Sequence, residues 1–260
     1  MRLKVGAATS VGRVRPHNED AYLARPGQGL FVVCDGMGGA AAGEIASALA
    51  IETIAARLNG GPPPGGTYRG YQPRTAWLGQ AIESANRAII ERAASDAAQA
   101  GMGTTVVGAW LRDGMASIAH VGDSRAYLSN ADGFEALTAD HSLVEAQVQA
   151  GLIDREQSLK SEHQNILLRA LGRDPDVQVE LTEVLIAPGN RLLLCTDGLT
   201  RMVSDHGLAD CLDQHKGNPQ AACDALITQA NDAGGPDNIT VVIVDVQKST
   251  FGWLFGLFKG

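Results

Sequence analysis

Short apolar runs that end beside glycine and aspartate constrain the fold of this chain more than any other feature. Two of them, FVVC ending at Cys34 and LLLC ending at Cys195, lead into Asp-Gly within two residues. Asp-Gly and Gly-Asp turns typically join antiparallel strands, whereas parallel strands need a longer crossover between them. The pattern predicts mostly antiparallel strands over 3–9, 30–34, 104–111, 116–121, 125–129, 134–137, 177–186, 191–195 and 239–246.

Helical periodicity accompanies these strands. An alanine-rich stretch is expected to form a helix that stops at Asn59-Gly60-Gly61, and the proline- and glycine-rich segment 60–73 reads as a surface loop. The predicted helices cover 40–58, about 75–99, 142–174, 205–214 and 219–232. Helices beside antiparallel strands, with no internal repeat and no second core, indicate a single α+β domain built in layers.

Composition argues against several classes of function. A formal net charge of -8 is unfavourable for a nucleic-acid binder, which needs Lys and Arg to neutralise phosphates. The four cysteines form no CxxC pair, and Cys34 and Cys195 read as buried hydrophobes rather than redox groups. No secretory signal is recognised, and no apolar run reaches the ~18 residues of a membrane span. We therefore expect a cytoplasmic protein.

Acidic residues recur where the predicted strands begin or end. They are Glu19-Asp20, Asp35, Asp123, Asp197 and Asp237, and most have a glycine nearby. One Asp-Gly pair is more typical of a tight turn than of a site. Five acidic positions at strand ends favour a site for a hard divalent cation, which takes oxygen ligands. Glycine lets a backbone carbonyl approach such a cation closely.

Eight ordered strings resemble the bacterial branch of the PP2C-type protein phosphatases over about residues 1–247. They are GRVRPHNEDA (12–21), VVCDGMGG (32–39), GMGTTVV (101–107), AHVGDSRAYL (119–128), LTADHSLV (137–144), LLRALG (167–172), LLLCTDGLT (192–200) and GGPDNITVVIV (234–244). The resemblance implies a four-layer α-β-β-α sandwich of two antiparallel sheets flanked by helices. It also implies two Mn²⁺ or Mg²⁺ ions in a cleft at one end, and a third ion in bacterial members.

The resemblance also assigns roles to the cation ligands. Asp35 matches the aspartate that bridges both core ions, and Gly36 matches the glycine that offers its carbonyl. Asp197 and Asp237 match the remaining ligands of the first ion.

Five further matches complete the predicted site. Glu19 and Asp20 match the acidic pair beside the second ion, where coordination is direct or through water. Asp123 matches the residue that holds the third ion together with Asp197. Arg15 matches the arginine that grips the substrate phosphate, and Asn238 is expected to position its neighbours.

The implied activity is hydrolysis of phosphoserine and phosphothreonine by direct attack of a water that two metals activate. Such a reaction requires no covalent phosphoenzyme. Such enzymes commonly oppose bacterial serine/threonine kinases. The proton donor is open, because Met37 and Ala40 stand where relatives carry histidine. His120, His141 or a coordinated water could serve, although both histidines also suit structural roles.

Two other functions compete with this interpretation. A catalytically weak phosphoprotein-binding module predicts a lost ligand, yet Arg15 and the aspartates are all present. A metal-dependent phosphodiesterase or nuclease fits poorly with an acidic chain. Residues 141–172 match the family's flap; their charges suit either a solvated helix face or a role in substrate selection.

The segment 248–260 lies beyond the family match and is rich in aromatic residues. On a helix, Phe251, Leu254, Phe255 and Phe258 would share one apolar face. Such a face could pack on this domain, dock to a partner protein or associate with a membrane surface.

Overall fold

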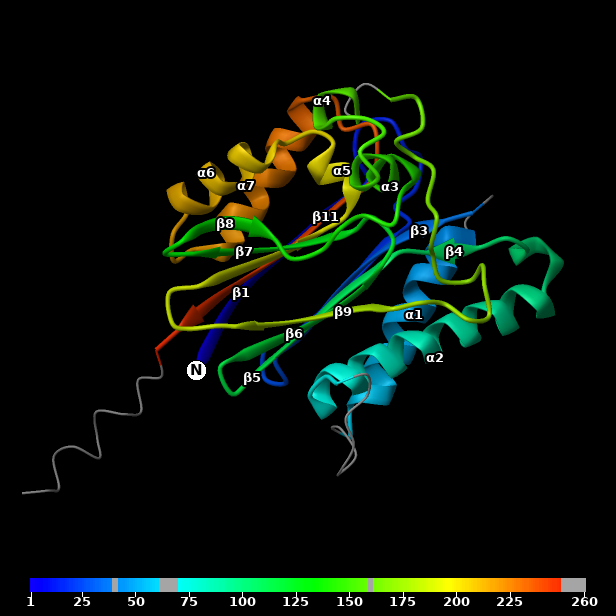
Figure 1. Cartoon of the computed structure of the whole chain (residues 1–260), viewed down its shortest axis with the longest axis horizontal. Coiled ribbons are helices and arrows are strands. Elements are labelled where there is room, and N and C mark those ends of the chain that lie inside the picture. The colour runs from blue at the N-terminus through cyan, green and yellow to red at the C-terminus, as the bar shows by residue number, and fades with distance from the viewer. Residues whose placement is uncertain (39–41, 61–69, 159–160, 249–260) are drawn as a thin grey trace, which may run out of the picture.

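Two antiparallel β-sheets lie face to face in the computed structural model, which describes residues 1–38, 42–60, 70–158 and 161–248 (Figure 1). The first sheet has the order β1 (Arg2–Ser10), β11 (Ile239–Gln247), β10 (Arg191–Cys195), β7 (Arg125–Asn130) and β8 (Gly133–Ala136). The second has the order β2 (Asp20–Arg25), β3 (Leu30–Met37), β5 (Val106–Arg112), β6 (Met115–Val121) and β9 (Glu180–Leu185). The short strand β4 (Gly103–Thr104) also pairs with β3.

Helices cover the outer face of each sheet. Figure 1 shows α1 (Ala42–Leu58) and α2 (Pro73–Ser95) over the second sheet, and α6 (Asp205–Gln214) and α7 (Pro219–Asp232) over the first. Short helical elements are η1 (Ala97–Gln99), α3 (Leu143–Gln149), α4 (Arg155–Ser158) and α5 (Asp197–Thr200). The predicted four-layer α-β-β-α sandwich is confirmed.

Three apolar cores separate the four layers, which explains the uninterrupted apolar runs. Along β3, Phe31 and Val33 face the core between the sheets, while Val32 and Cys34 face the core beneath α1 and α2. Successive strand residues point to opposite faces, so a strand buried on both sides must be apolar throughout. Fully burying a side chain such as Phe31 contributes about 1.5–3 kcal/mol.

Strand register gathers the predicted site at one end of the sandwich. Cys195, which precedes Asp197 by two residues, is opposite Val241 of β11 and Arg125 of β7. The turn that carries Asp123 and the turn that carries Asp237 therefore flank the same end of the first sheet. In the second sheet, Asp20 is directly opposite Asp35.

The segment 142–174 was expected to be helical, and the structure corrects this prediction. Only α3 and α4 form, because most described side chains from 150 to 166 are exposed. Without a continuous apolar stripe, tertiary packing cannot stabilise a long helix. The segment is instead held at its ends, where Leu168 N donates to His141 O at 2.8 Å.

Two further differences concern strands. The strand β2 was not predicted, although DAYLAR is half-buried along its length. The strands β6 and β7 do not continue one meander, because β6 belongs to the second sheet and β7 to the first. Gly122 makes this crossing with φ of 107°, and a Cβ there would lie 2.6 Å from the Thr105 side chain. Glycine is therefore required immediately before Asp123.

Some predictions fall on residues outside the described ranges. These are Ala40, most of the 60–73 loop and the aromatic segment from 249 to 260. Within the described part of the chain, no helix combines the length and the apolar character of a membrane span.

Candidate functional site

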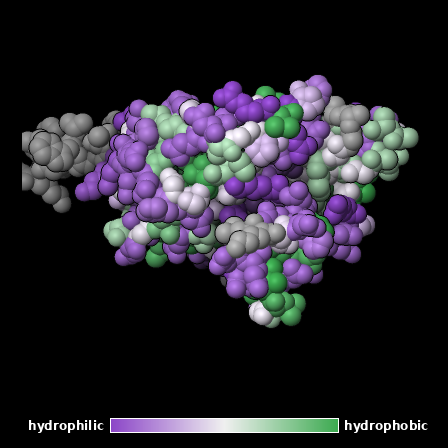
Figure 2. Space-filling model, turned by 90° about the horizontal axis from the view of Figure 1, so that it is seen from above, coloured by the Kyte–Doolittle hydropathy of each residue, from purple (hydrophilic) through white to green (hydrophobic). Residues whose placement is uncertain are grey.

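A cavity of about 390 Å³ lies at the end of the sandwich where β3 ends and β11 begins. All of the predicted site residues except Asp20 line it: Arg15, Glu19, Asp35, Gly36, Asp123, Asp197, Asp237 and Asn238. Seen from above, the face that carries α3, α4 and α5 is mostly hydrophilic (Figure 2). Residues that are up to 223 positions apart thus converge on one polar cavity.

Asp35 and Gly36 are held by backbone contacts inside the second sheet. Asp35 N donates to Thr105 Oγ1 at 3.1 Å, and Thr105 N donates back to Asp35 O at 2.9 Å. A Cβ at Gly36 would lie 2.2 Å from Gly43 O and 2.4 Å from Glu19 O, so only glycine fits. Burial, reinforced by neighbouring carboxylates, raises the pKa of Asp35 well above its ordinary value.

The other aspartates approach from three separate turns. Asp197 opens α5 directly after β10, and burial raises the pKa of its carboxyl. Asp123 follows β6, and burial raises its pKa to about 8. Asp237 accepts from Arg15 Nη2 at 2.9 Å through Oδ2 and from Asn238 N at 2.9 Å through Oδ1. One cavity therefore holds carboxylates whose mutual repulsion disfavours the ionised forms.

Asp20 lies beneath the cavity rather than in its wall. Its Oδ2 accepts from Thr240 Oγ1 at 2.7 Å and from Thr196 Oγ1 at 3.0 Å. Its Oδ1 is buried and has no hydrogen-bond partner. Burial raises the pKa of this carboxyl to about 7. Asp20 thus ties β2 to the first sheet. It also leaves one oxygen unsatisfied beside Asp35, the residue directly opposite it on β3.

Asn238 organises the loop that carries Arg15 and Glu19. Its Oδ1 accepts from Glu19 N at 2.8 Å, and its Nδ2 donates to Val11 O and His17 O, both at 2.9 Å. One buried side chain therefore uses its amide fully to fix the loop against the start of β11. This geometry agrees with the positioning role predicted for it.

The donor set fits hard divalent cations. Four buried or nearly buried carboxylates, Asp20, Asp35, Asp123 and Asp197, have raised pKa values. Among the described side chains, Asp20 Oδ1 and Asp197 Oδ1 are buried acceptors without a partner. A buried acceptor without a donor is costly, and Mg²⁺ or Mn²⁺ would satisfy it and keep the carboxylates ionised. No sulfur or imidazole is needed for such a site.

Sequence reasoning assigned no site role to four of the residues that line the cavity. Arg201 forms an ion pair with Asp197 Oδ2, and its Nη2 lies 3.9 Å from Asp123 Oδ2. The signal that could have found it is its spacing of four residues after Asp197, which puts the two side chains on one face once the segment forms the helical turn α5. His17 lines the cavity from the loop of Arg15, two residues further on. Asn165 and Leu167 of the flap also reach it.

The two histidines considered as proton donors lie elsewhere. His120 and His141 stack with ring centroids 4.5 Å apart, and neither lines the cavity. His120 Nε2 is 2.9 Å from Ala139 O, and His141 Nε2 is 3.1 Å from Glu180 Oε2. Burial lowers the pKa of both rings, that of His141 to about 4, so both are neutral at neutral pH. The geometry favours the structural role for both.

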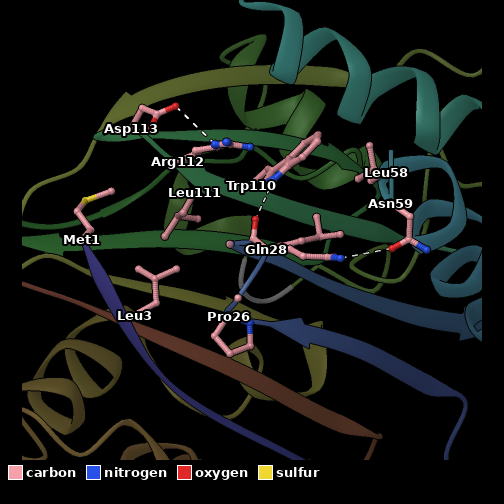
Figure 3. A pocket seen from close by; sticks show the side chains of 13 residues that line it. Met1, Leu3, Pro26, Gln28, Leu58, Asn59, Trp110, Leu111, Arg112 and Asp113 are labelled. Atoms are coloured by element: carbon pink, nitrogen blue, oxygen red, sulfur yellow. Dashed lines mark hydrogen bonds and ion pairs between the residues drawn. The ribbon is translucent and has the colours of Figure 1, made fainter. Parts of the chain in front are cut away.

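A larger cavity of about 480 Å³ lies at the opposite end of β3 (Figure 3). Leu30 lines it, five residues or roughly 17 Å along the strand from Asp35. Trp110 Nε1 donates to Gln28 O at 3.0 Å there, and the one acid in its lining, Asp113, pairs with arginines. This second cavity gathers no cluster of catalytic or cation-binding groups among its described lining residues. It is therefore not the candidate functional site, although it is larger than the cavity that Asp35 lines.

Comparisons with known proteins agree with this geometry. The family model "Protein phosphatase 2C" matches residues 9–222. A serine/threonine phosphatase stp of Listeria welshimeri is 38% identical over 240 residues, which are 91% of this chain and 93% of the relative. The crystal structure of the Mycobacterium tuberculosis serine/threonine phosphatase PstP/Ppp superposes with a TM-score of 0.86 at 33% identity, covering 95% of this chain and 99% of the other. A structure of the PstP catalytic domain with two manganese ions gives a TM-score of 0.82 at 34% identity, covering 95% and 99%.

Proposed function

Since the chain belongs to the protein phosphatase 2C family of metal-dependent serine/threonine phosphatases, we propose that it removes phosphate from phosphoserine and phosphothreonine in proteins. One observation carries this proposal: Asp35, Asp197 and Asp237 share a cavity with Arg15. Such a combination offers oxygen ligands for divalent cations and a cationic fork for a phosphate in one place.

We propose that two cations bind among these carboxylates. Asp35 would hold both, with Asp197, Asp237, Glu19 and the carbonyl of Gly36 around it. When bound, a pair of Mn²⁺ or Mg²⁺ ions supplies activation of water and neutralises charge on the phosphoryl oxygens. Asp20, whose Oδ2 is committed to Thr196 and Thr240, is better placed to act on the site from below. The oxygen donor set suits either metal.

Arg15 is positioned to orient the phosphate. Its side chain is 52% exposed, and only Nη2 is engaged, by Asp237. The remaining guanidinium donors face no protein partner among the described hydrogen bonds, so they are free for phosphate oxygens. A planar guanidinium binds two such oxygens at once, which fixes the orientation of the ester.

We propose His17 as the group that protonates the leaving seryl or threonyl oxygen. Met37, which lines the same cavity, has no proton to give. Among the described residues, His17 is the one histidine in the cavity lining, and Asn238 holds its backbone at 2.9 Å. Imidazole is the side chain best suited to proton transfer near neutral pH.

The flap, residues 141–172, is proposed to select substrates. Its residues Asn165 and Leu167 line the cavity, and Leu171 pairs with Thr104 beside β3. Most described residues from 150 to 166 are exposed, so this segment can contact the protein that carries the phosphate. Because the flap is anchored on both sides of this segment, its contacts are held next to the site.

The proposed partners are phosphorylated proteins and the serine/threonine kinase that modifies them in a bacterial cytoplasm. Bacterial relatives named as serine/threonine phosphatases support this setting. We propose that residues 1–247 form the catalytic domain, since β11 ends at Gln247. The segment 249–260 would then locate the enzyme through a partner protein or a membrane surface. Truncation after Gln247 should preserve kcat on an aryl phosphate and change localisation or partner capture.

The activity is tested by comparing two phosphate esters. The purified chain with Mn²⁺ should release phosphate from a phosphothreonine peptide and leave bis(4-nitrophenyl) phosphate nearly untouched. Faster cleavage of the bis-ester would instead indicate a phosphodiesterase. Tight binding of the peptide without turnover would favour the phosphoprotein-binding module.

A further inference from the structure

A side chain of the chain itself already neutralises the Asp123–Asp197 pair. Arg201 forms an ion pair with Asp197 Oδ2, and the same Nη2 lies 3.9 Å from Asp123 Oδ2. Both carboxylate side chains are buried, at 8% and 12% exposure. The Arg201 side chain is 27% exposed, so the guanidinium closes one side of the site cavity that it lines.

Local structure places Arg201 there. Asp197 opens α5, and Arg201 N donates to Asp197 O at 2.9 Å as the helix ends. Residues four apart on a helix lie on the same face, so the Arg201 side chain returns towards Asp197. Asp123 reaches the same point from the sheet crossing at Gly122. The contact therefore follows from the backbone of two neighbouring turns.

Geometry brings two buried carboxylates to one guanidinium, since Asp123 and Asp197 both turn an Oδ2 atom towards Arg201 Nη2. Two like charges buried side by side are unfavourable unless a counter-charge lies between them. A guanidinium stays charged at every physiological pH and is less strongly hydrated than an ammonium. It can therefore provide positive charge to a buried pair at all times. A divalent ion between the two Oδ2 atoms would have to compete with this guanidinium.

We infer that Arg201 is a built-in cation that takes the place of a third metal ion between Asp123 and Asp197. This inference rests on the proposed function, and it adds that the phosphatase works with two bound cations rather than three. The resemblance noted above assigned Asp123 and Asp197 to a third ion. In this chain, an arginine one turn after Asp197 occupies that position.

Metal stoichiometry tests the inference directly. Equilibrium dialysis of the full-length protein against Mn²⁺ should give about two ions per chain for the wild type. Arg201→Ser leaves two buried carboxylates without a counter-charge, so it should bind about one ion more, with weaker affinity. Arg201→Lys keeps the charge and should remain near the wild-type count. Adding Asp123→Asn to Arg201→Ser should remove the extra ion.

Arg112→Ser is the matched control, because Arg112 is an exposed arginine that pairs with Asp113 at the opposite end of β3. Arg112→Ser should not change the number of bound ions.

A wild-type count of about three ions would overturn the inference, as would an unchanged count in folded Arg201→Ser. If Arg201→Ser does not fold, the wild-type and Arg201→Lys counts still decide. A wild type that binds Mn²⁺ and hydrolyses phosphothreonine but holds three ions refutes the inference alone. A wild type that binds no Mn²⁺ refutes the proposed function as well.

Discussion

Arg15 Nη2 donates to Asp237 Oδ2 at 2.9 Å, joining two residues that lie 222 positions apart in the sequence. Asp237 raises the pKa of the Arg15 guanidinium, so this group is always charged. The proposed phosphate-binding arginine thus touches a proposed cation ligand. A cation that bound the Asp237 carboxylate would release Nη2 for the phosphate as well, which would couple metal binding to substrate binding.

Arg15→Ala should lower kcat/KM on a phosphothreonine peptide by about 10- to 100-fold. The basis is the loss of charge-assisted hydrogen bonding that contributes roughly 1.5–3 kcal/mol in total. A rise in KM should carry most of the effect. Arg15→Lys, which keeps the charge without the planar fork, should recover part of it. The nearby Arg13→Ala is a control, since Arg13 is 65% exposed and pairs loosely with Asp232 at 3.9 Å. Equal kcat/KM in Arg15→Ala and wild type would rule out a phosphate contact.

His17→Gln should lower kcat on a phosphothreonine peptide by about 100-fold, a typical contribution of a general acid. The loss should be much smaller on 4-nitrophenyl phosphate, because its leaving group departs without a proton. Steady-state kinetics on both substrates measure this difference. His141→Gln is the comparison, because it alters a buried histidine outside the cavity. An equal loss on both substrates in His17→Gln would show that this residue does not protonate the leaving group.

Metal-free protein should lose stability as pH rises from about 6.5 to 8. Burial raises the pKa of Asp20 to about 7 and of Asp123 to about 8. In this window the folded carboxyls hold protons that the unfolded chain, with an Asp pKa near 3.9, has lost. More protons bound in the native state means that the free energy of unfolding falls with rising pH. The two buried histidines act in the opposite direction near pH 6.5, because the unfolded chain still binds protons there that the folded rings do not, and the comparison with Asp123→Asn cancels their contribution.

Thermal unfolding in chelator at about pH 6.5 and 8 checks this prediction, with Asp123→Asn as the comparison. The variant should show a flatter dependence, and saturating Mn²⁺ should abolish the fall in the wild type. A Tm that rises with pH in chelator would contradict the assignment of buried protonated carboxyls.

The Arg191–Asp245 pair should be a major determinant of stability away from the site. Arg191 Nε donates to Asp245 Oδ1 at 2.6 Å, and both side chains are at least 92% buried. The Arg191 guanidinium also donates to the carbonyl of Leu212 near the end of α6. Asp245→Ala should cost about 3–5 kcal/mol, because it leaves a buried guanidinium charge without its partner. The double variant Arg191→Met with Asp245→Leu should be much closer to wild type. Urea unfolding measures both, and additive losses would refute the pairing.

The layers and most of the site could be predicted because they depend on local patterns. A strand such as β3, buried on both faces, has to be apolar throughout, and a turn beside a carboxylate site needs glycine. These requirements are visible as FVVCDG and CTDG. The ordered strings then indicated which carboxylates would meet.

What the sequence did not reveal depends on contacts between distant segments. Asp20 and Glu19 are neighbours in sequence, yet pairing with Thr196 and Thr240 places Asp20 beneath the cavity while Glu19 lines it. The role of Arg201 depends on the position of Asp123 across the sheet crossing. The flap was mistaken for a helix because its polar residues are helix-compatible, and only the absence of a surface to pack against decides otherwise.

The central claim is that this chain hydrolyses phosphate esters through cations bound at Asp35. Phosphate release from a phosphothreonine peptide should disappear after exhaustive chelation and return with Mn²⁺. Asp35→Asn should lose at least about 100-fold at saturating Mn²⁺, because the carboxylate shared by both cations is gone. Iodoacetamide should leave the wild-type activity intact, since all four thiols are buried and burial raises their pKa values. Full activity after chelation, or an unimpaired Asp35→Asn variant, would contradict the account.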